Sequence, residues 1–441
     1  MLDKVTSVFF CEAEIKTDRS ALDFREILDM RGGEKKIMTF TSRITIAIAT
    51  GAVLVSSLAP LANADTATVA GNGTESNNTV TVSVKNTNTV NQSNTANITN
   101  HIVSNAATGD NTASKNTGGS QGIQTGNATN NVTVTNAVNL NKADVSCASC
   151  NSGALTVKEA GNGNGTDNNV NATNTNSVFV NQTNNANLKN SVTANAFTGK
   201  NDTSLNTHGA NTIVTGNAHS AVNVTNAANA NIAQVSGGNN GSSDPSSAVV
   251  SGNGIYSDNG IQLNQDSSVV VGQRNSATIG NVISAEAKTG RNEAEFNTGG
   301  SSGIGTGNAT TNTTVDNAVN FNAASLNCDC VLSGLNTKVA GNGDGSNNAV
   351  TASADNSQFP TQLNNAGLLN STFGNAKTGD NNLQFGTTYH GDPLIITGNG
   401  NSGTTVSNTG GVNTLGNINL GNYQFGFDFS GLASFLNGFG A

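Results

Sequence analysis

The stretch GNGTESNN occupies residues 71–78, and close relatives of it return three more times along the chain. They are GNGNGTDNN from Gly161, GNGIYSDNG from Gly252 and GNGDGSNNA from Gly341, at spacings of 90, 91 and 89 residues. A second landmark, TGDN at residue 108, keeps the same step, with TGKN, TGRN and TGDN at residues 198, 289 and 378. This periodicity predicts an array of four similar units that begin near residues 71, 161, 252 and 341.

The composition favours strands over disorder. The chain has 441 residues, 51 Gly, only 4 Pro, 11% charged residues and a formal net charge of −9, whereas disordered chains usually carry high charge and much proline. Runs such as TVTVSV (79–84) and NVTVTNAVN (131–139) alternate apolar with polar residues, as strands do. The mild acidity comes without basic clusters, which argues against nucleic acid and anionic membranes as partners.

Residues 38–64 have the pattern of a secretory signal peptide. Arg43 precedes an apolar core that begins at Ile44, and the sequence Ala-Asn-Ala (62–64) predicts cleavage before Asp65. A transmembrane anchor is disfavoured because the apolar core is short and is interrupted by a glycine and two serines. We therefore expect a secreted protein, extracellular or at the cell surface, which meets the membrane only through its signal peptide.

The first 37 residues do not match the rest of the chain. A signal peptide normally stands at the start, so we interpret residues 1–37 as a misassigned start or a pre-sequence, with Met38 as the first residue of a bacterial protein.

Each unit subdivides further. In the first unit, segments start at Gly71, Val90, Gly109 and Gly126, which predicts rungs of about 18 residues, five per unit. Glycine and asparagine suit the corners of such rungs because both tolerate positive φ, and stacking would align Asn, Gln and Thr in ladders. The expected fold is an all-β solenoid over residues 65–400, a rod on the order of 95 Å long at about 4.8 Å per rung.

Two other architectures are weaker. An array of four β-sandwich domains, one per unit, would need bulky core residues, but aromatic residues make up only 4% and there is no Trp. A disordered chain would not keep the alternating runs.

One pattern occurs once per unit: Gln-x-x-x-Ala-x-Ile/Leu-x-Asn, at residues 92–100, 182–190, 273–281 and 362–370. It resembles the curlin repeats of bacterial amyloid fibres, although the spacing from Gln to Ala is shorter and the chain is longer. The chain is also similar in composition to Asn/Thr-rich secreted repeat proteins of small-genome bacteria. The resemblance implies self-association, with Gln92, Gln182, Gln273 and Gln362 as ladder or association residues.

No constellation predicts catalysis, a bound metal or a cofactor. The four histidines (101, 208, 219 and 390) fall at non-equivalent repeat positions, and the phosphate-loop-like GIGTGNAT (303–310) lacks the following lysine. Acidic residues are sparse and are not stacked in the expected short rungs. The loop NGDGS (342–346) has alternating oxygen side chains, but no bidentate glutamate follows, so we interpret it as a turn.

The expected mature chain has two cysteine pairs, Cys147 with Cys150 and Cys328 with Cys330. In a rod of short rungs the pairs would lie about 48 Å apart, far beyond the reach of a disulfide, which is about 7 Å between Cα atoms. Local disulfides, intermolecular cross-links and a metal shared between chains remain possible, and export favours the disulfides.

The segment 401–441 ends in an aromatic tail. Phe425, Phe427 and Phe429 alternate with Gly426 and Asp428, which places three rings on one face of a strand. A cap over the last rung is the first interpretation; a docking strand for another subunit or surface partner and insertion into an outer membrane are the others.

The sequence thus predicts a non-enzymatic structural protein that forms or decorates a fibre, coat or adhesive layer. Self-association is the expected partnership, and a cell-surface glycan or envelope component is a further expected partner. One alternative is a monomeric adhesin or an ice- or glycan-binding module, although regular Thr-x-Thr motifs are missing from most of the chain. The other is a glycan-active β-helix enzyme, which would require stacked carboxylates.

Overall fold

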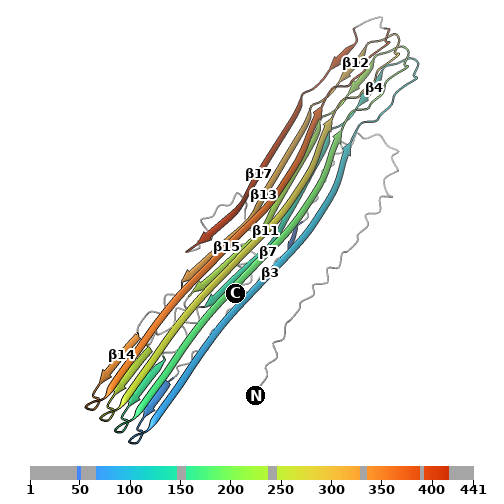
Figure 1. Cartoon of the computed structure of the whole chain (residues 1–441). Helices are drawn as coiled ribbons and strands as arrows, with labels where there is room; N and C mark the ends of the chain where they lie inside the picture. Colours follow the sequence, from blue (N-terminus) through green and yellow to red (C-terminus); the bar gives the residue numbers. More distant parts are fainter. Residues whose placement is uncertain are drawn as a thin grey trace, which may run out of the picture. The chain divides into compact units, whose positions relative to one another are not determined.

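The computed structural model describes residues 47–50, 66–146, 155–236, 246–327, 335–387 and 392–416, which form a stack of four rungs (Figure 1). Every strand of a rung pairs in parallel with its equivalent in the next rung. The predicted class, an all-β solenoid of stacked repeats, is confirmed. No helix occurs in these ranges, so no helical membrane span is found among them.

Four sheets make up the stack, and each rung contributes one strand to each. A rung begins in a short start sheet, runs the length of a long sheet, passes a small end sheet and comes back in a return sheet. The long sheet contains β3 (Asn77–Ala107), β7 (Asp167–Phe197), β11 (Asp258–Lys288) and β15 (Asn347–Lys377).

The other three sheets have shorter strands. The start sheet contains β2 (Thr66–Ala70), β6 (Thr156–Ala160), β10 (Ser246–Ser251) and β14 (Leu335–Ala340). The end sheet contains β4 (Gln121–Gln124), β8 (Asn211–Val214), β12 (Ser302–Gly305) and β16 (Leu394–Ile396). The return sheet contains β5 (Ala128–Ser146), β9 (Ala218–Ser236), β13 (Ala309–Asn327) and β17 (Gly400–Leu415), and β1 (Ala47–Thr50) pairs with the outer edge of β5.

The prediction of several short rungs per unit is wrong, because one whole repeat unit makes a single rung. Asn78 pairs with Asn168, its equivalent 90 residues later, and the long strands run for 31 residues without a corner. Val90, an expected rung start, lies in the middle of β3 as a core residue. The long dimension of the stack therefore follows the strands, about 100 Å for 31 residues at about 3.3 Å each, and not the stacking direction.

Corners occur where the chain adopts positive φ in every rung. The first glycine of each GNG stretch does so, with φ between 64° and 69° at Gly71, Gly161, Gly252 and Gly341. This region is open to glycine at little cost. The return strand has a similar position, occupied by Asn139, Asn229 and Asn320 and then by Gly411, all at positive φ. Asparagine in three rungs and glycine in the fourth fit this position because both tolerate the left-handed region.

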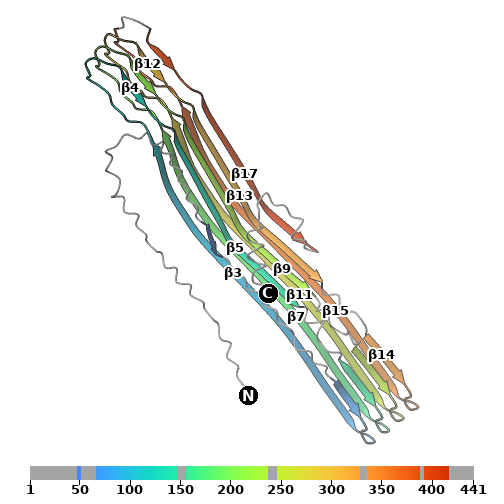
Figure 2. The ribbon, with the colours of Figure 1, turned by 180° about the vertical axis from the view of Figure 1, so that it is seen from behind.

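The return strands run along the long strands in Figure 2. A thin core of side chains fills the space between the long sheet and the start and return sheets that pack on it. Burial alternates along the long strands, so every second residue faces inward. Val178 and Val180 of β7, for example, pack with Ala233 and Val235 of β9. Small and branched side chains suffice for this thickness, which explains how a chain so poor in aromatic residues folds.

The fourth rung extends beyond the predicted boundary at residue 400, because β17 pairs with β13 as far as Leu415. Within the predicted signal peptide, the four residues of β1 are described and the rest lie outside the described residues. The four cysteines and the three phenylalanines of the tail also lie outside them.

Candidate functional site: the amide ladders and their open ends

The four glutamines of the curlin-like pattern lie in one column of the long sheet. Each Nε2 donates to the Oε1 of the preceding rung: Gln182 to Gln92 at 2.7 Å, Gln273 to Gln182 at 2.8 Å and Gln362 to Gln273 at 2.7 Å. The same nitrogen also donates to a carbonyl of the return strand, as from Gln182 to Ile232 at 2.9 Å. The column therefore holds the rungs together and the two layers together.

Asparagines form a double ladder across the core. In the long sheet, Asn190 Nδ2 donates to Asn281 Oδ1 at 2.7 Å, and in the return sheet Asn226 Nδ2 donates to Asn317 Oδ1 at 2.7 Å. The two columns are also joined to each other, because Asn190 Nδ2 donates to Asn226 Oδ1 at 3.1 Å. The full columns are Asn100, Asn190, Asn281 and Asn370, facing Asn136, Asn226, Asn317 and Asn408.

A second double ladder has the same design. Asn184 donates to Asn275 at 3.1 Å and to Asn231 of the facing return strand at 2.9 Å. Its columns are Asn94, Asn184, Asn275 and Asn364, facing Asn141, Asn231, Asn322 and Asn413. Two further columns stand at corners: Asn72, Asn162, Asn253 and Asn342, and Asn111, Asn201, Asn292 and Asn381.

We expect Asn190→Ala to destabilise the stack by roughly 2–4 kcal/mol, since a buried amide that loses its partners costs its desolvation energy. Asn190 is 2% exposed, donates twice, and accepts from Asn100 and Asn136. Chemical denaturation of the variant measures the loss. Asn185→Ala is the matched control, because this side chain is exposed on the outer face of the same strand; equal losses for both variants would contradict a structural role for the ladder.

The ladders have a direction. In the asparagine columns the amide of one rung donates to the next rung, and in the glutamine column it donates to the previous rung. At the fourth rung, no described acceptor continues the column beyond Asn370, and no described donor reaches Gln362 Oε1. At the first rung, no described donor reaches Asn100 Oδ1. The two ends of the stack thus present opposite hydrogen-bonding groups.

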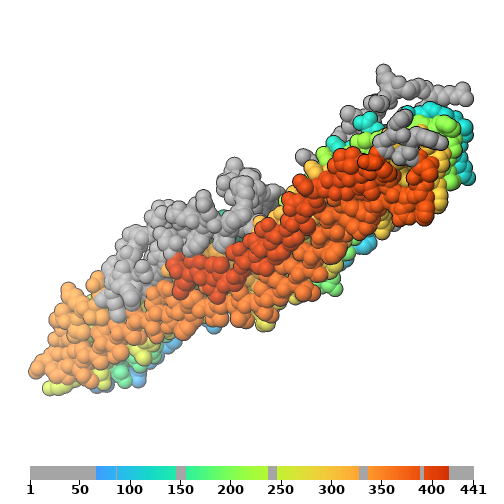
Figure 3. Space-filling model, turned by 90° about the horizontal axis from the view of Figure 1, so that it is seen from above, coloured from blue at the N-terminus to red at the C-terminus, as the bar shows by residue number. Residues whose placement is uncertain are grey.

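In the glutamine column and in the asparagine columns that face each other across the core, the two end rungs carry the same side chains. Gln92 corresponds to Gln362, Asn100 to Asn370 and Asn136 to Asn408, and both corner columns begin and end with asparagine. The edge strands β15 and β17 of the fourth rung form the visible face of the described stack in Figure 3. A further rung with this sequence pattern would find a donor in the asparagine columns of the long sheet, whereas the return-strand column of Asn139 ends in Gly411 and offers none.

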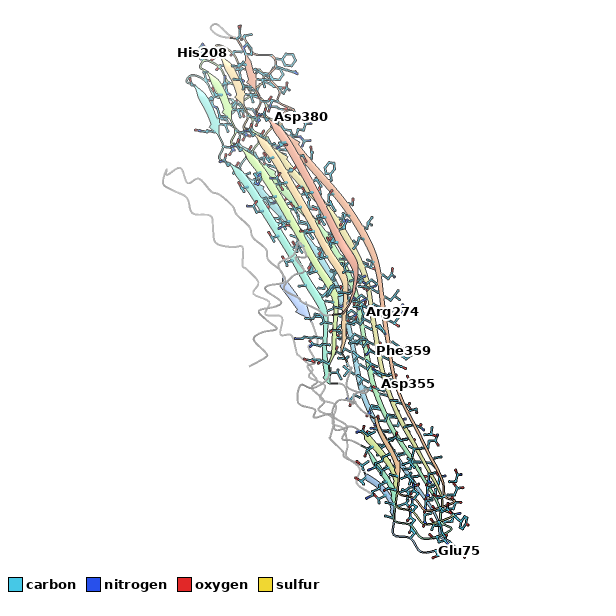
Figure 4. The ribbon with its side chains drawn as sticks, turned by 90° about the vertical axis from the view of Figure 1, so that its left-hand side faces the viewer. Glu75, His208, Arg274, Asp355, Phe359 and Asp380 are labelled. Carbon is cyan, nitrogen blue, oxygen red and sulfur yellow. The ribbon has the colours of Figure 1, made fainter. Side chains whose placement is uncertain are left out.

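The outer face of the long sheet carries large exposed apolar side chains in the fourth rung. The outward column that starts with Thr89 continues with Phe179, Val270 and Phe359. In the fourth rung four outward residues, here called the apolar strip, are more than half exposed: Phe359 (58%), Leu363 (51%), Leu369 (68%) and Phe373 (59%). Figure 4 shows Phe359 on the same side of the stack as Arg274 and Asp355.

Charged residues gather where the long strands end. Ion pairs join Lys288 to Glu286 and Lys377 to Asp380, and Lys288 lies 5.7 Å from the ring centre of Phe197. The hydrogen bond from Lys377 lowers the pKa of Asp380 below its ordinary value. Each of these ion pairs joins residues of one rung, and none of them joins two rungs.

The expectation that acidic residues are not stacked is wrong, because it assumed short rungs. Asp167 is the register neighbour of Asp258, and Asp266 that of Asp355. Asp202 and Glu293 are bridge partners in the corner. Each of these is a pair only, and within the described ranges no group of three His, Cys, Asp or Glu residues could hold a metal ion.

The separation expected between the two cysteine pairs also assumes short rungs, and the cysteines themselves lie outside the described residues. Ser146 pairs with Ser236, and Ser236 pairs with Asn327. The strands that lead into the two cysteine pairs are therefore only two strand spacings apart, about 10 Å.

No match was found when the chain was compared with protein-family models, with curated proteins and with solved structures.

Proposed function

We propose that this chain is an exported structural protein that assembles end to end, the first rung of one copy on the fourth rung of another, into a fibre, coat or adhesive layer outside the cell. The observation that carries the proposal is the match between the two ends of the amide ladders in the long sheet, where no described strand lies beyond β3 or β15. Export is supported by the signal-peptide pattern of residues 38–64, and self-association by the resemblance to curlin repeats.

Stacking between copies would repeat the contacts that already join the rungs. Edge strands offer unpaired backbone groups to another chain unless they are covered, and β15 offers 31 residues of edge. Asn370 Nδ2 would donate to Asn100 Oδ1 of the incoming copy, as Asn281 Nδ2 donates to Asn370 Oδ1 within one copy. The strands would lie across the fibre axis, as in cross-β structures, and each copy would add about 19 Å, four rungs at about 4.8 Å.

We expect residues 65–441 to form filaments visible by negative-stain electron microscopy, with a meridional reflection near about 4.8 Å in fibre diffraction. Asn370→Asp should raise the concentration needed for filament growth by at least about tenfold, since one buried donor is lost and a charge is added to the interface. Within one copy the substitution keeps the oxygen that accepts from Asn281 at 2.7 Å and loses only the exposed bond from Asn370 Nδ2 to Asn408 Oδ1 at 3.2 Å, so thermal unfolding of the monomer should change little.

Asn365→Asp is the matched control, because it adds the same charge to the same strand on the exposed outer face. It should form filaments like the parent chain. Equal growth of both variants would rule out the ladder ends as the interface. Single particles at every concentration would instead favour a monomeric adhesin, for which the apolar strip is the exposed contact surface.

A further inference from the structure

In the fourth rung, the outer edge of the start sheet has no strand paired with it among the described residues. β14 pairs with β10 on one side, and no described strand lies on its other side. Val250 of β10 is fully buried, whereas its partner Val339 of β14 is 50% exposed. Beneath this edge, Val350 and Ala352 of β15 are only partly buried. The core that the start and long sheets share is therefore uncovered at this end.

The sequence after the last described strand has nearly the same spacing as the segments that lead from a return strand to the next start strand. In the return sheet, Ala143, Ala233, Ala324 and Leu415 share one column. The intervals from the three alanines to the corner glycines that follow them, Gly161, Gly252 and Gly341, differ from one another by only a residue or two. Gly431 follows Leu415 at nearly the same interval, so it falls where a fifth corner glycine would stand.

The phenylalanines of the tail occupy sequence positions equivalent to those of the inward residues of the start strands. In the start strands, the inward residues lie four and two positions before the corner glycine, as Val157 and Glu159 do before Gly161, and Ala248 and Val250 do before Gly252. Phe427 and Phe429 lie four and two positions before Gly431, and Phe425 lies six positions before it, like Ser246 before Gly252. Because side chains alternate between the faces of a strand, all three share the inward phase.

We propose that residues 425–430 form a fifth strand of the start sheet, paired in parallel with β14, and that Phe425, Phe427 and Phe429 close the core over Val339, Val350 and Ala352. The strands before it place residues such as Ala248 and Val250 at these positions, between two neighbouring rungs. A final strand has no rung beyond it, so larger rings are needed to cover the same apolar surface.

This inference goes beyond the proposed function, because it concerns the end of a single chain. It also bears on assembly, since β2 of an incoming copy would pair with the same edge of β14. The tail would then have to leave before a fibre could grow at the start sheet, while β15 and β17 stay open.

A disulfide trap tests the register. In residues 65–441 with the four native cysteines replaced by serine, the pair Thr337→Cys and Phe427→Cys places two cysteines on neighbouring strands, about 5 Å apart between Cα atoms and within disulfide range. The matched control, Thr337→Cys with Asp428→Cys, shifts the second cysteine by one residue to the opposite face of the strand. At nanomolar protein the first pair should oxidise at least tenfold faster than the control and run as a cross-linked monomer.

Equal oxidation of the two pairs, or none in the first, would overturn the inference. Cross-linked dimers in place of monomers would overturn it as well, because they would mean that the tail belongs on another copy. Hydrogen exchange of the unsubstituted chain provides a second test: removal of residues 417–441 should reduce the protection of β14 amides at least tenfold, and unchanged protection would contradict the fifth strand. Both tests use dilute monomer, so their outcome is separate from filament growth.

Discussion

Gly199→Ala is expected to prevent the rungs from stacking at the end of the long sheet, with a loss of at least about 3 kcal/mol in the free energy of unfolding. Gly199 stands in a column with Gly109, Gly290 and Gly379, where the long strand passes into the corner. A Cβ atom on Gly199 would lie 1.6 Å from the carbonyl oxygen of Gly290, and one on Gly290 would lie 1.5 Å from that of Gly379. Since these neighbours are backbone atoms held at the rung spacing of about 4.8 Å, relief requires separating the rungs.

Gly280→Ala is the control for this prediction. Gly280 lies in β11 on the outer face, and a Cβ atom there would meet nothing within 4 Å. We expect a change within about 0.5–1 kcal/mol, of either sign, because alanine also restricts the unfolded chain. Denaturant titrations of both variants compare their free energies of unfolding. Similar unfolding midpoints would mean that the close approach of backbone atoms at the Gly199 column does not restrict how the rungs stack.

The same glycines show what the sequence predicts well. A residue required in every rung, such as Gly71 or Gly109, recurs at the rung spacing because each copy meets the same steric limit. The period of the repeat, the corner glycines and the column of Gln92 could therefore be read from the sequence. A column is visible in a sequence because its members lie one period apart.

Contacts across the core cannot be recognised in this way, because their partners are not separated by one repeat period. Asn100 donates to Asn136, 36 residues away, and Asn94 donates to Asn141, 47 residues away. These separations along the chain depend on the lengths of the strands, which could not be predicted from the sequence. An asparagine in the middle of a 31-residue strand looks like a turn residue until its partner in the return strand is known, and this ambiguity produced the error of short rungs.

Two further expectations depended on the short rungs. With several short rungs in each unit, Asp266 and Asp355 would lie far apart, and so would the strands that lead into the two cysteine pairs. With one long rung in each unit, Asp266 and Asp355 become direct neighbours. The rung length therefore decides which charges meet, and it must be known before any charged residue is assigned a role.

One buried carboxyl group makes the stability of the stack depend on pH. Glu159 faces inward between Val69 and Val250, is fully buried, and neither of its carboxyl oxygens meets the geometry of a hydrogen bond. Burial, with a smaller contribution from the charge of Asp167, raises the pKa of Glu159 from 4.5 to about 8, and the backbone at Val170 offsets part of this rise.

The sign of the effect follows from proton binding. Below pH 4.5 the carboxyl group is protonated in both the folded and the unfolded chain. Between pH 4.5 and about 8 only the folded chain keeps the proton, so the free energy of unfolding falls as the pH rises, by about 1.4 kcal/mol per unit. Above about pH 8 the loss is complete, on the order of 5 kcal/mol for the full difference in pKa.

Glu159→Val should remove this slope, because valine occupies the same column in the first and third rungs. Denaturant titrations at about pH 4.5 and about pH 8.5 should find the variant close to the parent at the lower pH and several kcal/mol more stable at the higher pH. Glu75→Gln is the control, since Glu75 is exposed at a corner and glutamine keeps its unbranched shape at this positive φ, and it should keep the slope of the parent. If Glu159→Val kept that slope as well, the pH dependence would have to arise from other groups, and the buried carboxyl would carry its charge at a smaller cost than its surroundings predict.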